Sequence, residues 1–232
     1  MRILGIESSS LVAGVAVVTD GILTAEYTIN YKKTHSQTLL PMLDEMAKLL
    51  ELDLDTIDGI AVSAGPGSFT GLRIGSATAK GLGLALKKPL IHIPTVDAMA
   101  YNLWGSSALV CPIMDARRNQ VYTGLYHVEQ ELDVVKEQCA MDMGQLIDAL
   151  NERGERVIFL GDGVPVFRTL IQQQMTSPYS FAPAQSSRQR AASVAALGVL
   201  YMEAGRTEPA SEHKPEYLRK PQAEREREGI VL

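Results

Sequence analysis

The sequence has few cysteines, few aromatic residues and no excess of positive charge. Among its 232 residues there are two cysteines and one tryptophan, 6% are aromatic, and the formal net charge is −5. Cys111 and Cys139 lie far apart in apolar contexts, which predicts reduced core thiols rather than a disulfide scaffold. The charge provides no overall cationic field for nucleic acid. These absences indicate a globular protein of the cytoplasm.

Long apolar runs and metal-ligand motifs are missing as well. No apolar stretch reaches the length of a membrane span, and neither HExxH nor CxxC occurs. The histidines share no ligand spacing; they are His35, His92, His127 and His213. No serine lies in a readable Ser/His/Asp pattern. We therefore expect no membrane contact, no metal site and no catalytic residue in this chain.

What the sequence does contain is an unusual stretch, Ala64–Gly75, which reads AGPGSFTGLRIG. It follows the apolar run Gly59–Ser63 and leads into Thr70–Leu86, which has no proline. This order predicts a strand, a tight Gly-Pro-Gly turn and a helix. Ser68 or Thr70 is expected to cap the helix, whose free N–H groups would form a seat for an anion.

Within the predicted helix, small residues recur at every fourth position: Gly71, Gly75, Ala79 and Gly83. A glycine inside a helix costs about 1 kcal/mol relative to alanine, so this stripe needs a compensating gain. Close approach of another backbone is the usual one. Two interpretations remain open here: packing against this chain's own sheet or a neighbouring helix, and docking of another protein.

The helix predicted over Ser36–Glu51 carries more apolar residues than one buried face requires. They cover most of its circumference and include Leu39, Leu40, Met42, Leu43, Met46, Ala47, Leu49 and Leu50. We expect a partner to cover the side that the sheet leaves free. The predicted interface comprises His35, Leu39, Met42, Leu43, Met46, Leu50, Gly71, Leu72, Gly75, Ala79 and Gly83. A homodimer and a heterodimer with a related protein would both use it.

The predicted elements repeat in order along the chain. The first half has strands over Arg2–Ile6, Val12–Thr19, Ile22–Asn30, Gly59–Ser63 and Leu90–Ile93, with two helices between them and a third opened by Thr95. The second half has strands over Ala108–Met114, Gln120–Val128, Leu132–Gln138 and Arg156–Leu160, with helices over Asp142–Arg153, Pro165–Gln174 and Ser186–Ala204. Two such units describe an α/β protein with tandem ribonuclease-H-like lobes.

The expected division places a first lobe with the partner-binding helices at residues 1–104, a second lobe at 105–205 and a polar tail at 206–232. Trp104–Ser107 is the predicted joint between the lobes. Within the tail, Arg225–Glu228 is interpreted as a solvated end of the chain rather than a binding motif.

In two-lobed folds of this kind, nucleotide phosphates bind between the lobes. The candidate residues are Glu7, Ser8 and Ser9 in the first hairpin, Asp115, Arg117 and Arg118 in the second, and Gly161 and Gly163 near a possible adenosine position. A phosphate hairpin needs glycine so that backbone N–H groups reach the oxygens, and arginines occupy that place here. Gly161–Gly163 is equally consistent with an ordinary strand-to-helix turn. The predicted cleft therefore has only part of the residues that a nucleotide-binding site of this kind requires.

Several of these motifs together resemble one known family. They are Ile3–Ser9 (ILGIESS), His35–Pro41 (HSQTLLP), Ala64–Gly75, Asp115–Arg118 with Val121–Tyr122, and Tyr217–Arg219. Over nearly the whole chain the sequence is similar to the TsaB family, also called YeaZ. The resemblance implies the actin/hexokinase/Hsp70-like two-lobed fold. It also implies an accessory role in threonylcarbamoyladenosine synthesis at position 37 of tRNAs that read ANN codons.

The resemblance further implies partners. These are the catalytic paralogue TsaD as a heterodimer, the ATPase TsaE, tRNA through the complex, and a homodimer when the chain is alone. TsaD carries a metal-binding HxxxH on the helix equivalent to Ser36–Glu51, where this chain has only His35 nearby. No metal or cofactor is therefore assigned to this chain, and ATP or ADP is expected only at the level of the complex.

Two alternatives stay open. One is a small ATPase or kinase of the same fold, with Glu7, Asp115 and Gly161–Gly163 holding a magnesium nucleotide. The other is a metallopeptidase of the glycoprotease type.

Overall fold

The computed structural model describes residues 1–219, in two five-stranded sheets and six α-helices. The first sheet contains β1 (Arg2–Glu7), β2 (Val12–Thr19), β3 (Ile22–Asn30), β4 (Gly59–Gly65) and β5 (Leu90–Pro94). The second contains β6 (Leu109–Asp115), β7 (Gln120–His127), β8 (Asp133–Asp142), β9 (Val157–Leu160) and β10 (Tyr179–Phe181). The helices are α1 (His35–Leu49), α2 (Phe69–Leu86), α3 (Thr95–Tyr101), α4 (Met143–Arg153), α5 (Gly163–Gln174) and α6 (Ala191–Glu203), with 3-10 turns at Leu54–Thr56 and Ala184–Ser186.

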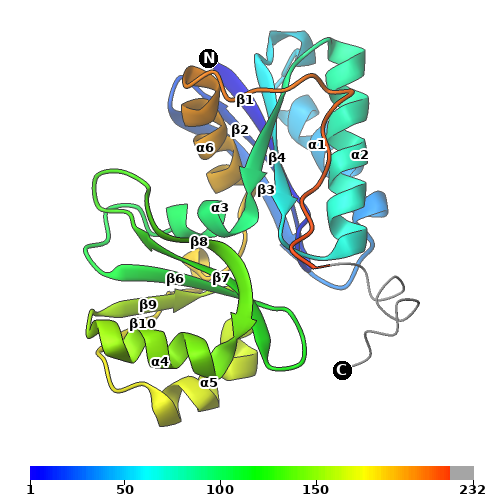
Figure 1. The fold of residues 1–232 in the computed structure, drawn as a ribbon. Coiled ribbons are helices and arrows are strands. Elements are labelled where there is room, and N and C mark those ends of the chain that lie inside the picture. The colour runs from blue at the N-terminus through cyan, green and yellow to red at the C-terminus, as the bar shows by residue number, and fades with distance from the viewer. Residues whose placement is uncertain (220–232) are drawn as a thin grey trace.

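The two sheets share one topology (Figure 1). Their strand orders are β3-β2-β1-β4-β5 and β8-β7-β6-β9-β10, the second read from its β8 edge. In each sheet the first three strands form an antiparallel meander, and the last two are added in parallel. The predicted α/β class with two repeated halves is therefore confirmed.

Some element boundaries differ from the predicted ones. Strand β10 was not predicted, because its three residues are too few to show a period. Helix α6 begins at Ala191 rather than at Ser186, since the preceding residues run between the lobes. Helix α1 begins at His35, one residue before the predicted start at Ser36, with Thr34 at the N-cap position. Residues 220–232 of the predicted tail, including Arg225–Glu228, lie outside the described residues.

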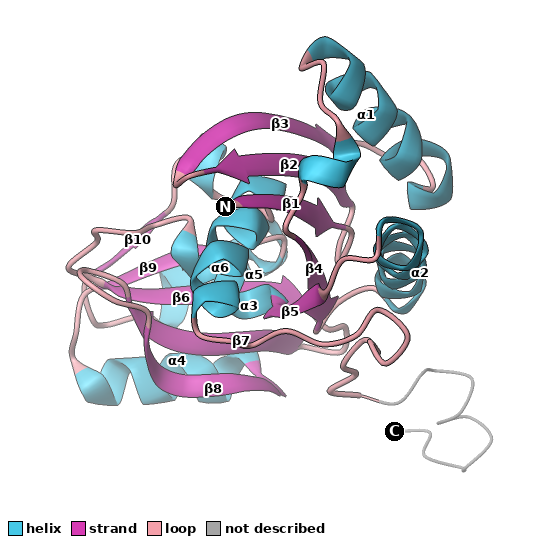
Figure 2. Cartoon of the chain, turned by 90° about the horizontal axis from the view of Figure 1, so that it is seen from above, coloured by secondary structure: helices cyan, strands magenta, loops and turns pink. Residues whose placement is uncertain are grey.

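Helices cover both faces of the first sheet, with α1 and α2 on one side and α6 on the other (Figure 2). Successive side chains of a strand point to opposite faces. Leu4 and Ile6 of β1 accordingly join the core under α1 and α2, whereas Ile3 packs under α6. Small residues let α6 lie close to the sheet: a Cβ on Gly5 would come within 2.5 Å of the carbonyl oxygen of Ala191.

The last helix of each half packs against the sheet of the other half. Val96, Met99 and Ala100 of α3 belong to a core cluster with Val110 and Tyr126 of the second sheet. In the opposite direction, α6 follows the second-lobe strands in the chain but packs on the first sheet. The predicted lobe limits at residues 104 and 205 stay a prediction. By sequence α6 falls within the predicted second lobe, but it packs on the sheet of the first lobe.

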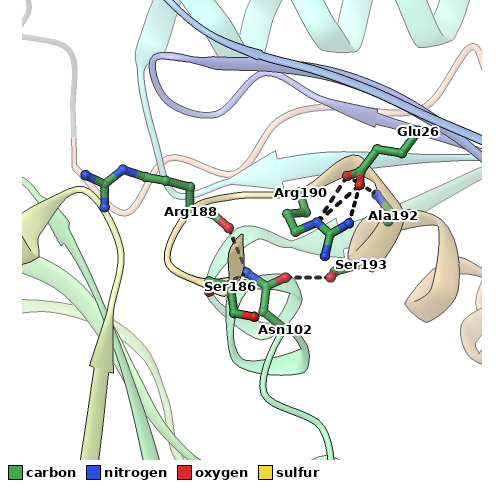
Figure 3. Close-up of polar contacts among 7 residues, drawn as sticks. All are labelled: Glu26, Asn102, Ser186, Arg188, Arg190, Ala192 and Ser193. Carbon is green, nitrogen blue, oxygen red and sulfur yellow. Dashed lines mark hydrogen bonds and ion pairs between the residues drawn. The ribbon is translucent and has the colours of Figure 1, made fainter. Parts of the chain in front are cut away.

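The segment leading into α6 is held by the side-chain amide of Asn102 (Figure 3). Its Nδ2 donates to the carbonyl oxygens of Ser186 (3.2 Å) and Arg188 (2.7 Å). Its Oδ1 accepts a hydrogen bond from the hydroxyl of Ser193 at 2.5 Å. One side chain at the end of α3 therefore fixes the path by which the chain returns to the first lobe.

A carboxylate from the first sheet receives the start of α6, as Figure 3 also shows. Glu26 of β3 forms an ion pair with Arg190 and accepts a hydrogen bond from the backbone N–H of Ala192 at 3.2 Å. Arg190 occupies the N-cap position without a side-chain cap. The Glu26 carboxylate therefore satisfies an N–H group that the helix leaves free, and its negative charge favours the N-terminal end of the helix dipole.

At the lobe boundary, the buried carboxyl group of Asp97 connects α3, β7 and α6. Asp97 of α3 accepts hydrogen bonds from the hydroxyl of Tyr126 on β7 at 2.8 Å and from that of Tyr201 on α6 at 3.3 Å. Burial raises the pKa of Asp97, and the two hydroxyls oppose that shift.

Cys111 and Cys139 are both free, as predicted. Within residues 1–219, no helix has the length and apolar character needed to cross a membrane.

The close contact of α6 with the first sheet is expected to be sensitive to a single methyl group. In Gly198→Ala the new Cβ would lie 2.6 Å from the Cβ of Ala61 and 3.0 Å from Cγ2 of Ile3. Overpacking of this kind costs about 1–3 kcal/mol, so we expect urea unfolding to show a lower free energy of unfolding despite the better helix propensity of alanine.

Gly81→Ala is the matched control, because it also lies inside a helix but nothing lies within 4 Å of its added Cβ. This variant is expected to keep or raise the free energy of unfolding, by up to about 1 kcal/mol. Equal behaviour of the two variants would contradict close packing of α6.

Candidate functional site

A cleft of about 730 Å³ lies where the two lobes meet. Its walls come from the loop after β1, the start of α2, the turn between β6 and β7, and tail residues 216–219. The fold thus brings together Ser9, Asp115 and Arg117 from the predicted nucleotide site. The other candidates do not line the cleft; they are Glu7, Ser8, Arg118, Gly161 and Gly163. Asp162, the middle residue of the predicted Gly161–Gly163 turn, does line it.

The glycines of the AGPGSFTG stretch allow the start of α2 to dock on the loop after β1. A Cβ on Gly67 would overlap the carbonyl oxygen of Ser9, and a Cβ on Gly71 would overlap that of Ser8. The backbone N–H of Ser68 donates to the carbonyl oxygen of Ser9 at 2.6 Å. The stretch is therefore explained by a contact between two segments of this chain.

The expected anion seat at the start of α2 is partly used by the chain itself. Ser68 caps the helix, as predicted, by accepting a hydrogen bond from the N–H of Gly71 at 3.3 Å. Ser8 Oγ donates to the carbonyl oxygen of Gly71 at 2.9 Å. Ser9 Oγ donates to Glu7, and Ser10 Oγ accepts from the N–H of Val12. The hydroxyls expected to contact phosphate are thus engaged within the first lobe.

Glu7 is the last residue of β1 and is fully buried. Its Oε1 accepts hydrogen bonds from the N–H and the hydroxyl of Ser9, both at 2.6 Å, whereas Oε2 has no partner among residues 1–219. Burial raises the pKa of Glu7 to about 7, against the opposing effect of the Ser9 hydrogen bonds. Near pH 7 both the protonated and the ionised form of Glu7 are therefore populated.

The turn between β6 and β7 has a left-handed backbone at three successive residues. Arg117, Arg118 and Asn119 have φ angles of 66°, 54° and 57°, a region that residues with a Cβ adopt at a cost. Asp115 holds the turn by accepting from the N–H of Arg117 at 2.8 Å and pairing with its guanidinium at 3.1 Å. The turn presents Arg117 to the cleft, with its charge already partly balanced.

The Gly161–Gly163 turn is required by packing. Gly161 has φ 111°, and a Cβ there would overlap the carbonyl oxygen of Ile113. Its own carbonyl oxygen accepts from Arg188 Nη1 at 2.7 Å. A Cβ on Gly163 would lie 2.9 Å from the same oxygen of Ile113. Of the two interpretations in the sequence analysis, the strand-to-helix turn accounts for both glycines.

The tail crosses the first lobe and closes one side of the cleft. The N–H of Glu216 donates to the carbonyl oxygen of Ala64 at 2.7 Å, and the ring of Tyr217 lies 4.8 Å from that of Phe69. Arg219 Nη1 donates to the carbonyl oxygen of Ala116 in the second lobe at 2.7 Å. The sequence analysis expected a polar tail; its one signal for this position was the family motif Tyr217–Arg219.

His35 is buried at the start of α1, with its Nε2 3.1 Å from the carbonyl oxygen of Val12. This contact links α1 to β2 and uses one ring nitrogen. Among the described residues, no group of three metal-ligating side chains includes His35. The contact with Val12 gives His35 a role in fixing the start of α1 beside β2.

Most of the residues predicted to form the partner interface are instead buried within this chain. On α1, His35, Leu39, Met42, Leu43 and Met46 are buried in this chain's own core, and Leu50 is half-buried. On α2, Gly71, Leu72, Gly75, Ala79 and Gly83 are buried as well. A Cβ on Gly75 would overlap Ser8 Oγ, and one on Gly83 would lie 2.8 Å from the Cβ of Ala210. These side chains face inward, so a partner on this helix pair would contact the opposite face.

The outward face of α2 carries small and apolar residues at helical spacing. Thr70, Arg73, Ala77, Gly81 and Leu84 are exposed and lie three or four residues apart, which places them on one side of the helix. Leu84 is 59% exposed, and nothing lies within 4 Å of a Cβ built on Gly81. The neighbouring α1 exposes Leu40 and Leu49. The sequence period indicated the helix pair but not which face was free.

The chain is similar in sequence to known proteins of tRNA modification. The sequence model of the family described as "TsaD: tRNA N6-adenosine threonylcarbamoyltransferase" matches residues 23–227. The "tRNA threonylcarbamoyladenosine biosynthesis protein TsaB" of Bacillus subtilis (strain 168) is 32% identical over 228 residues, covering 97% of this chain and 96% of that protein. A protein of the same name from Escherichia coli (strain K12) is 34% identical over 146 residues, covering 59% of this chain and 63% of that protein.

A solved structure gives the same architecture. "YeaZ from Pseudomonas aeruginosa" superposes with a TM-score of 0.77 at 23% sequence identity, covering 94% of this chain and 99% of that chain. At this level of identity the likeness concerns the fold alone. It agrees with the repeated strand order described above, and the two-lobed actin/hexokinase/Hsp70-like class is confirmed.

The buried Glu7 is expected to make stability depend on pH. Its pKa is raised from about 4.5 to about 7 on folding, so between these values the folded state binds more protons than the unfolded state. The free energy of unfolding should therefore fall as pH rises through this window, by about 3 kcal/mol in total.

In Glu7→Gln the amide resembles the protonated acid and does not titrate. Urea unfolding at pH 5 and pH 8 should show the loss for the natural chain and a loss smaller by about 3 kcal/mol for the variant. Parallel pH profiles of the two proteins would show that Glu7 is ionised in the folded state.

Proposed function

Because the chain belongs to the TsaB family, we propose that it acts in tRNA threonylcarbamoyladenosine biosynthesis as a non-catalytic subunit that activates a TsaD-type transferase. The observation that carries this proposal is the likeness to a TsaB protein over 97% of the chain. The modified nucleoside would be adenosine 37 of tRNAs that read ANN codons, reached through the complex. Such work belongs to the cytoplasm, and a TsaE-type ATPase would join the assembly.

A non-catalytic role agrees with how the cleft uses its polar groups. The Ser8 and Ser9 hydroxyls bond within the first lobe, Glu7 is fully buried, and His35 contacts a backbone oxygen. The tail further occupies one side of the cleft. These groups stabilise the first lobe, and Arg219 of the tail connects it to the second lobe, which agrees with a scaffold role.

The proposed docking face is the outward side of α2 with the adjoining exposed leucines of α1. Ala77 and Gly81 are exposed but have little or no side chain, so another helix can approach the α2 backbone closely there. Leu84 and Leu40 would add apolar area at the edges. A TsaD paralogue of the same fold would pair its own helices with this face, and a homodimer formed by the chain alone would compete for it.

We expect Ala77→Glu to separate the chain from a TsaD-type partner. The residue is exposed on α2, so the monomer should unfold at an unchanged temperature, whereas a charge buried without a partner opposes docking. Co-purification with the TsaD protein of the same cell should be lost. Threonylcarbamoylation of tRNA, measured by mass spectrometry of nucleosides in a reconstituted reaction with TsaD and TsaE, should fall at least about tenfold.

The matched control is Thr169→Glu, which places the same charge on an exposed position of α5 in the second lobe. It should leave both co-purification and modification unchanged. Full activity of Ala77→Glu would place the docking face elsewhere, and modification that proceeds equally well without this chain would overturn the proposed role.

An ATPase or kinase remains the second candidate, because Asp115, Arg117 and Asp162 do line the cleft. Calorimetric titration of the isolated chain with magnesium ATP discriminates between the two roles. For a scaffold we expect no saturable heat at micromolar nucleotide. Micromolar binding that Arg117→Ala weakens, accompanied by release of phosphate, would favour the second candidate.

A further inference from the structure

Two histidines and a glutamate from distant parts of the sequence meet at the edge of the first sheet. They are His92 on β5 and Glu208 and His213 in the tail. One donor atom from each lies within 4.8 Å of the others, and the two imidazole rings are 5.8 Å apart. The histidines show no ligand spacing in the sequence, because more than a hundred residues separate His92 from Glu208 and His213.

Backbone contacts position the tail residues beside β5. Leu90 and Glu208 exchange two N–H···O hydrogen bonds of 2.9 Å, as neighbouring residues of antiparallel strands do. From α2, Lys80 Nζ donates to the carbonyl oxygens of Ser211 (3.0 Å) and His213 (3.2 Å). The cluster is therefore built from fixed segments on both sides rather than from mobile surface side chains.

His213 supplies a second and independent observation. Its side chain is fully buried, with Nδ1 2.5 Å from Glu208 Oε1. Its other ring nitrogen, Nε2, is also buried and has no hydrogen-bond partner among residues 1–219. A buried polar atom without a partner costs free energy.

The donor set indicates which ion would fit. Imidazole nitrogens with a carboxylate oxygen suit a borderline-soft divalent ion such as Zn²⁺ rather than Mg²⁺ or Ca²⁺, which prefer oxygen ligands alone. His92 and Glu208 are each about one-third exposed, which leaves a path for entry. Glu216 Oε2 lies 3.8 Å from His92 Nε2, close enough to serve as a further ligand.

We propose that His92, Glu208 and His213 form a site for a divalent transition-metal ion of the zinc type. The bound ion joins β5 to the tail through coordinate bonds, with no change of oxidation state and with release of any proton that a ligand carries. Its consequence reaches the cleft, because the same tail places Tyr217 and Arg219 in the cleft wall. The ion thereby stabilises the tail in the position that closes the cleft.

The test uses the full chain without a histidine tag, stripped with a chelator and then titrated with zinc chloride in a calorimeter. We expect one equivalent to bind with a dissociation constant below 1 μM, an order of magnitude typical of a site with three protein ligands. Cobalt(II) in place of zinc should give the visible absorption of a low-symmetry, four- or five-coordinate ion.

The variants His92→Asn and Glu208→Gln keep side chains of similar size at partly exposed positions, so folding should survive. Each should weaken zinc binding about 100-fold or more, on the scale of losses seen even for outer-shell changes. His213→Asn should abolish binding, and circular dichroism reports whether this buried variant still folds.

His127→Asn is the matched control, because His127 also pairs with a glutamate, Glu155 at 3.3 Å, but in the second lobe. It should leave the zinc affinity unchanged. Absence of a sub-micromolar site in the natural chain, or equal binding by the natural chain and the His92 and Glu208 variants, would overturn the proposal.

Discussion

The arrangement of the molecule depends on helix α6 returning from the second lobe to pack on the first sheet. Without it, one apolar face of that sheet, including Ile3 and Ala61, would be exposed to water. Helix α3 lies between the lobes and shares the buried Asp97 carboxyl group with Tyr126 and Tyr201. The two lobes are therefore held by a shared core, and the cleft between them has walls whose spacing is set by this packing.

The contacts around the cleft extend the same principle. The loop after β1, the start of α2 and the tail are bonded to one another, and Arg219 connects the tail to the turn of the second lobe. Most of these contacts lie within the first lobe, and the Arg219 contact connects that lobe to the second one.

Much of the fold was predictable from the sequence, because local signals agree with the tertiary structure. Strands β1 and β2 contain apolar runs, and the Ala64–Gly75 stretch predicted a turn and a helix. The predicted glycine stripe was correct in its spacing. The sequence left open what covers the stripe, and only the structure shows Ser8 and Ala210 beside Gly75 and Gly83. A periodic pattern defines a face but does not say what covers it.

Other features depend on contacts between residues distant in the sequence and left no local signal. The cluster of His92 with His213 is of this kind. The same holds for α6, whose amino-acid sequence does not reveal which sheet it will cover. This last feature has a consequence for ancestry. A half-length precursor with one such sheet would have had a bare face, and it could have covered that face only by borrowing the terminal helix of a second copy. The fusion of two copies into one polypeptide would then preserve an exchange that began between separate molecules.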